Sequence, residues 1–132
     1  MKKIDKVILV LLTIEHLGFG LYGLYSPSAI ADIIGYDLQT EFAYSEIRAN
    51  YAMFTVIGLL AFFSIFFKSL IKQTYIIYAF IFSSLILGRI LNYFLTGDMN
   101  TPIAVTIFAE VVVISLCFWR LFSLRDKKEI ID

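Results

Sequence analysis

Charged residues are scarce in this sequence, because only 17% of its 132 residues are Asp, Glu, Lys or Arg. A soluble domain usually has about a quarter of its residues charged, so a soluble enzyme and a disordered chain are both disfavoured. The 11 basic and 11 acidic residues give a net charge of zero. Nothing in this balance indicates a nucleic-acid partner.

Cysteine and histidine occur once each, as Cys117 and His16. A single cysteine cannot form an internal disulfide or a CxxC redox pair. One histidine without H-x-x-x-H spacing does not make a zinc site, and no serine has the His/Asp partners of a hydrolase. We therefore expect no metal, no cofactor and no assigned catalytic residue. An enzyme stays open, although the sequence leans against one.

Apolar residues are abundant, at 60% of the chain, and the mean hydropathy is +0.84. A helix that crosses the hydrocarbon core needs about 20 apolar residues. Runs that are apolar on every side exclude a membrane β-barrel, in which polar and apolar residues alternate. We predict an all-α fold, an integral membrane four-helix bundle that forms a single transmembrane domain over residues 1–132. The four predicted spans are residues 7–25, 47–67, 74–95 and 102–124.

Basic residues near the span ends predict the orientation, because lysine and arginine favour the cytoplasmic side. The four spans place nine of them on one side and acidic residues on the other, so both termini should be cytoplasmic. The nine basic residues are Lys2, Lys3, Lys6, Lys68, Lys72, Arg120, Arg125, Lys127 and Lys128. The acids opposite them are Asp32, Asp37, Glu41 and Asp98.

The first outer loop is the only long connection, and it has helix signals of its own. Ser26-Pro27 resembles a helix start and Gly35 a helix end, with isoleucines on one face between them. We predict a short interfacial helix here, while a lid over a cavity remains an alternative. Further helix starts are expected at Thr40 and at Thr101-Pro102.

The segment Gly18 to Gly23 reads G-x-G-x-x-G, the pattern of a dinucleotide-binding turn. It follows no strand and lies inside an apolar run, so a nucleotide site is excluded. The glycines are instead expected to let two helices pack closely.

Ionisable groups inside the predicted spans are the strongest functional signal, because each costs about 2.5–3.5 kcal/mol in the bilayer. With a rise of 1.5 Å per residue, Glu15, Glu110 and Arg89 lie about 15, 12 and 9 Å below the outer ends of their spans. Shallower polar groups can join them in one polar cavity in the outer half of the bundle. The full candidate set for binding lipid or another polar ligand is Arg48, Arg89, Glu46, Glu15, Glu110, His16, Asn50, Asn92 and Tyr93.

Two interpretations of this set remain open. The charges can be buried ion pairs that hold the helices together. They can also line a cavity for water or a lipid headgroup, and both roles can hold at once. His16 has a similar ambiguity between a packing residue and a protonation switch.

Several short motifs show a family resemblance that covers nearly the whole chain. They are Leu24-Tyr25-Ser26-Pro27, the run Glu46-Ile47-Arg48-Ala49-Asn50-Tyr51, Gly88-Arg89 and Glu110. With them the chain resembles small bacterial four-span inner-membrane proteins of unknown function in the DoxX/DoxD-like group. Family members usually have glycine after that tyrosine, where this chain has Ala52.

The resemblance extends to a small trimeric inner-membrane protein associated with envelope lipid homeostasis. It implies a homotrimer in the bacterial inner membrane, with a lipid-accessible cavity. The wider group is also similar to sterol-isomerase-type bundles, which implies an enzyme alternative.

The preferred hypothesis is therefore a homo-oligomeric protein that binds or handles membrane phospholipid. The alternatives are an intramembrane enzyme or redox partner for a quinone or isoprenoid, a structural scaffold subunit and a small transporter.

Overall fold

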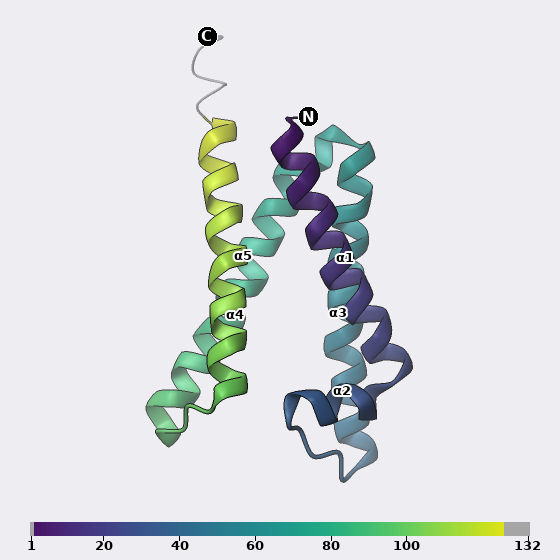
Figure 1. Ribbon diagram of the computed structural model, residues 1–132, viewed down its shortest axis with the longest axis vertical. Helices are drawn as coiled ribbons and strands as arrows, with labels where there is room; N and C mark the ends of the chain where they lie inside the picture. The colour runs from purple at the N-terminus through teal and green to yellow at the C-terminus, as the bar shows by residue number, and fades with distance from the viewer. Residues whose placement is uncertain (1, 126–132) are drawn as a thin grey trace. The chain divides into compact units, whose positions relative to one another are not determined.

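The computed structural model describes residues 2–125 and is helical throughout that range apart from its connections (Figure 1). Its elements are α1 (Lys3–Tyr25), α2 (Pro27–Ile34), α3 (Glu41–Phe66), the 3-10 helix η1 (Lys68–Leu70), α4 (Ile71–Thr96) and α5 (Thr101–Arg125). The all-helical prediction is confirmed. Lys127 and Lys128, which entered the orientation argument, lie outside the described residues, as does the side chain of Arg125.

Four segments are long and apolar enough to cross a membrane: Lys3–Tyr25, Glu41–Phe66, Lys68–Thr96 and Thr101–Leu124. Many large apolar side chains remain exposed on them, including Phe80, Phe94 and Phe108. Such a surface is compatible with an integral membrane protein, whose apolar exterior is covered by lipid.

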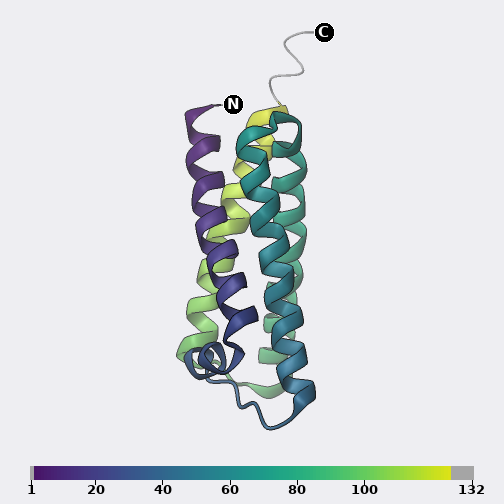
Figure 2. The same cartoon turned by 90° about the vertical axis from the view of Figure 1, so that its right-hand side faces the viewer.

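The chain divides into two compact units, Met1–Ile71 and Lys72–Asp132. In the first unit, α1 and α3 lie side by side (Figures 1 and 2). Their contacts run in opposite directions along the two helices, since Gly23 faces Tyr51, Gly20 faces Thr55 and Leu17 faces Gly58. The two helices are therefore antiparallel.

Glycine sets the closeness of this packing. A Cβ atom built on Gly20 would lie 2.5 Å from the backbone nitrogen of Thr55, and one on Gly58 would lie 2.4 Å from that of Leu17. The prediction of close packing is confirmed at Gly20 and Gly23. It is wrong at Gly18, where a Cβ atom would meet nothing within 4 Å.

Helix α2 contacts both α1 and α3 and lies across their ends (Figure 1). Pro27 occupies its first turn, where the missing N–H costs nothing. Gly35 ends it in the left-handed region with φ of 70°, and the Tyr36 amide donates to the Ala31 carbonyl at 2.8 Å. Ile30 and Ala31 are buried, whereas Ile33 and Ile34 are exposed. The start and end predicted for this helix are confirmed.

Helix α3 begins six residues before the predicted apolar span. Its cap is Thr40, whose hydroxyl accepts a hydrogen bond from the Ala43 amide at 3.1 Å. The helix start expected at Thr40 is therefore confirmed. The polar residues that follow Thr40 continue the helix, although they would not count toward a membrane span.

The second unit is the hairpin of α4 and α5. Gly97, with φ of 75°, ends α4, and its amide donates to the Tyr93 carbonyl at 2.8 Å. The cap of α5 is Asn100, whose side-chain oxygen accepts from the Ile103 amide at 3.0 Å. The expected cap at Thr101 is one residue too late, because the Asn100 side chain takes the capping bond and Thr101 is already helical.

Candidate functional site

A charged pair joins the two helices of the second unit. Arg89 on α4 donates through Nε to both carboxylate oxygens of Glu110 on α5, at 3.1 Å each. Its Nη2 atom lies 3.1 Å from Oε1 of the same carboxylate. One edge of the guanidinium therefore faces the carboxylate in the forked geometry that makes Arg–carboxylate pairs strong.

The two partners differ in exposure. The side chain of Glu110 is 4% exposed, whereas that of Arg89 is 34% exposed. A guanidinium has five N–H donors, and this pair uses those on one edge. Within the described part of the chain, no hydrogen bond from the other edge of Arg89 is present. The ion pair therefore gives the Glu110 carboxylate its hydrogen bonds and leaves the N–H donors on the other edge of Arg89 available for a further acceptor.

Arg89 also lines a pocket of about 310 Å³. Its other lining residues are Ser84, Leu85, Gly88 and Asn92 from α4 and Ile103 from α5. Ser84, Gly88 and Asn92 follow one another at intervals of four residues, so they form one stripe on α4. Gly88 is one of the lining residues, and a Cβ atom there would meet nothing within 4 Å.

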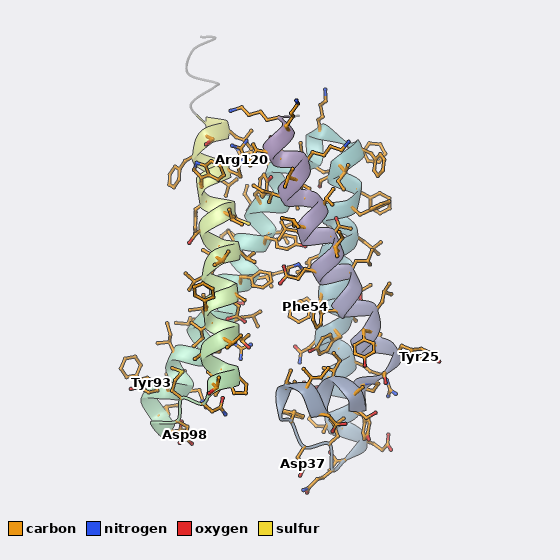
Figure 3. The ribbon with its side chains drawn as sticks, viewed as in Figure 1. Tyr25, Asp37, Phe54, Tyr93, Asp98 and Arg120 are labelled. Atoms are coloured by element: carbon orange, nitrogen blue, oxygen red, sulfur yellow. The ribbon has the colours of Figure 1, made fainter. Side chains whose placement is uncertain are left out.

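The pocket has two kinds of polar group besides Arg89. The Ser84 hydroxyl donates to the Ile81 carbonyl at 2.7 Å, which leaves its oxygen able to accept. Asn92 is exposed and offers an amide that can donate and accept. Tyr93, the next residue, is 43% exposed and does not line the pocket. Figure 3 shows it close to Asp98, at the end of the hairpin.

The predicted residues of α3 are gathered in its first turns. The Arg48 guanidinium carbon lies 6.0 Å from the centre of the Tyr44 ring. The Asn50 amide donates to the Glu46 backbone carbonyl at 3.1 Å. The side chains of Glu46, Arg48 and Asn50 are all exposed. Within residues 2–125, none of the three takes part in an ion pair.

The predicted residues of α1 point in different directions. His16 is buried, and its Nδ1 atom lies 3.0 Å from the Leu12 carbonyl, so Nδ1 carries the proton of that bond. Its ring meets the Phe54 ring edge-on at 5.9 Å, across the α1–α3 contact. Glu15 is 50% exposed and lies 4.0 Å from Nδ1 of His16. His16 is thus packed between two helices, while the adjacent carboxylate lies on the surface of its unit.

Sequence reasoning selected Arg89, Glu110 and Asn92, which the structure brings together in one unit. It did not select Ser84, Gly88 or Ile103 for the site. The four-residue spacing from Ser84 to Asn92 would have indicated the first two. Among residues 2–125, no three His, Cys, Asp or Glu side chains gather as metal ligands would.

Comparison with known proteins adds a family but no activity. Neither the curated proteins nor the solved structures include a match to this chain. Residues 4–121 match the family described as a domain of unknown function (DUF4345). The match includes α1 almost entirely, all of α2, α3 and α4, and the part of α5 that carries Glu110. The chain therefore belongs to the DUF4345 family.

Proposed function

We propose that the protein binds phospholipid in the bacterial inner membrane and supports cell-envelope lipid homeostasis as a homo-oligomer. The observation that carries this proposal is the guanidinium of Arg89. One of its edges is held by Glu110, the side chain is one-third exposed, and Arg89 lines a pocket beside a membrane-crossing helix. A phosphodiester is the anion in a bilayer that such an edge can bind through two hydrogen bonds.

The proposed orientation places this pocket in the outer half of the membrane. Lys68 precedes α4 and Lys72 lies in its first turn, and basic residues favour the cytoplasmic side. The α4–α5 turn is then outside, and both termini are cytoplasmic. Arg89 lies seven residues before Thr96, or about 10 Å along the helix from the outer end of α4. A long arginine side chain at this depth can direct its charge toward the headgroup region.

The same orientation places α2 at the outer interface. Its exposed isoleucines, Ile33 and Ile34, adjoin the exposed Asp32. An amphipathic helix of this kind lies in the interface with its apolar side chains in lipid. The four long helices together would form the four-helix bundle of one protomer.

The homo-oligomer rests on resemblance alone. The sequence motifs suggest a resemblance to AciT, a small trimeric inner-membrane protein associated with envelope lipid homeostasis, and the assembly that this resemblance implies is a homotrimer. The lipid-binding step does not depend on this number. Subunit number and bound lipid can be measured together.

The test is native mass spectrometry of the full chain extracted in a mild detergent. We expect a defined oligomer that retains phospholipid at a fixed stoichiometry. Replacing Arg89→Gln together with Glu110→Gln removes both charges without leaving a buried carboxylate unpaired. This double variant should retain about tenfold less lipid, the value of one lost charge-assisted hydrogen bond.

Lys72→Gln is the matched control, because it removes an exposed basic residue from the same helix away from the pocket. It should retain lipid as the wild type does. Arg48→Gln tests the second exposed arginine and should lower retention less than the double variant. Equal lipid retention by the wild type and the double variant would contradict the proposal. A lipid-free wild-type protein would favour a structural scaffold instead.

A further inference from the structure

The residues that line the Arg89 pocket favour some chemical groups of a ligand over others. Arg89 is its only charged member, and Ser84 and Asn92 are neutral hydrogen-bonding groups. Glu110, the acid paired with Arg89, is 3% exposed, and its carboxylate already faces the Arg89 guanidinium. The pocket thus offers donors and acceptors to hydroxyl groups and a cation to phosphate. It offers no carboxylate to a ligand ammonium.

The size of the pocket limits how much of a lipid it can hold. Its volume is about 310 Å³. At about 30 Å³ for each water-sized group, this space holds about ten such groups. A phosphate with a three-carbon polyol has about that many non-hydrogen atoms, so a headgroup of this size would fill the pocket. The acyl chains of the lipid would lie outside, along exposed apolar side chains near the end of α4 such as Leu91 and Leu95.

We infer that the α4–α5 pocket recognises the headgroup of an anionic phospholipid with hydroxyl groups, whose acyl chains stay in the bilayer. In this arrangement Arg89 binds the phosphate, and Asn92, one turn closer to the α4–α5 turn, binds the headgroup hydroxyls. The inference rests on the proposed function and names the class of lipid. It describes recognition of a lipid in place, without removal of the lipid from the membrane.

A substitution at Gly88 tests this inference without changing either residue of the Arg89–Glu110 ion pair. Gly88 lines the pocket and nothing lies within 4 Å of its Cβ position, so a side chain there has room and would take up space beside the pocket. Gly88→Leu should therefore narrow the pocket, and leucine also has the higher helix propensity. Gly18→Leu is the matched control, since Gly18 is another exposed helical glycine with nothing within 4 Å of its Cβ position.

The measurement is a native mass spectrometric titration of delipidated full-length protein in detergent. Phosphatidylglycerol and phosphatidylethanolamine with identical acyl chains are the two probes. The wild type should prefer phosphatidylglycerol by about tenfold. The preference should fall to near parity in Gly88→Leu and remain in Gly18→Leu. Asn92→Leu is a second pocket variant, at an exposed position, and should also lower the preference.

The outcomes separate this inference from the proposed function. Equal binding of both lipids by the wild type, or an unchanged preference in both pocket variants, overturns the inference and leaves lipid binding intact. Binding of neither lipid overturns the proposed function itself. Glycerophosphoglycerol and inorganic phosphate complete the experiment. If either soluble probe binds as tightly as phosphatidylglycerol, the ligand is a soluble phosphate and the lipid assignment is overturned.

Discussion

Arg89 and Glu110 meet across the α4–α5 hairpin through one edge of the guanidinium, with both Nε and Nη2 at 3.1 Å from the carboxylate. The acid is almost completely enclosed and the base is one-third exposed. The same contact therefore closes the hairpin and holds the arginine in a fixed direction. Structural and binding roles, which the sequence left as alternatives, can coexist in this one pair.

The first prediction concerns the stability of that pair. Arg89→Met should lower the free energy of unfolding by about 1–3 kcal/mol, because a buried carboxylate loses its hydrogen bonds. Arg89→Met with Glu110→Met should recover much of the loss, since two apolar side chains can replace a buried pair at little cost. Unfolding in mixed micelles, followed by circular dichroism, measures both. A double variant no more stable than Arg89→Met would contradict this explanation.

The second prediction concerns the α1–α3 contact. Gly58→Ala should destabilise the protein by about 1–3 kcal/mol, because a methyl group cannot fit without moving α1. The new Cβ atom would lie 2.4 Å from the Leu17 nitrogen and 2.9 Å from the His16 carbonyl carbon. Gly18→Ala is the control in open space and should be neutral or stabilising. Equal stability of the two variants in the same unfolding assay would rule out tight packing at Gly58.

The third prediction concerns the end of α2. Gly35→Ala should cost about 1 kcal/mol, because its φ of 70° is strained for a residue with a Cβ atom. Gly35→Asn should be tolerated better, since asparagine adopts the left-handed conformation more readily. Hydrogen exchange of the Tyr36 amide reports the effect, as this amide closes the turn onto Ala31. Equal exchange rates in the two variants would show that the left-handed conformation is not required.

The fourth prediction concerns orientation. In a Cys117→Ser background, Asp98→Cys should react with a membrane-impermeant maleimide added to intact spheroplasts, and Lys72→Cys should not. Both positions are exposed, so accessibility within the protein does not separate them. Permeabilised spheroplasts serve as the control, in which both should react. The reverse pattern would place the termini outside the cytoplasm.

Local chemistry made many helix ends predictable. Pro27, Gly35 and Thr40 act through their own backbone or side-chain geometry, and the structure uses all three as expected. The predicted apolar span begins at residue 47, whereas α3 begins directly after its predicted cap, Thr40, because hydropathy counts apolar residues while the helix follows its cap. The α5 cap required a choice between two adjacent residues that can both cap a helix, and the structure uses Asn100, the stronger cap, instead of Thr101.

The sequence predicted how deep the site residues lie along their helices, but not the directions in which their side chains point. The helical rise puts Arg89 and Glu110 within about 3 Å of the same level, and their contact agrees with that arithmetic. Which way each side chain points depends on tertiary packing, which the sequence does not specify. Glu15 and His16 illustrate this, since consecutive residues turn one side chain outward and the other into the α1–α3 contact.

The length of α4 bears on the depth at which Arg89 would lie in a membrane. This helix has 26 residues and is about 39 Å long, whereas a typical hydrocarbon core is about 30 Å thick. Hydrophobic mismatch is relieved by tilting in a thin bilayer and is smaller in a thick one. In the proposed orientation, bilayer thickness would set how far the Arg89 guanidinium lies below the headgroups. Under the proposed lipid binding, headgroup recognition at the pocket would therefore depend on the acyl-chain length of the surrounding bilayer.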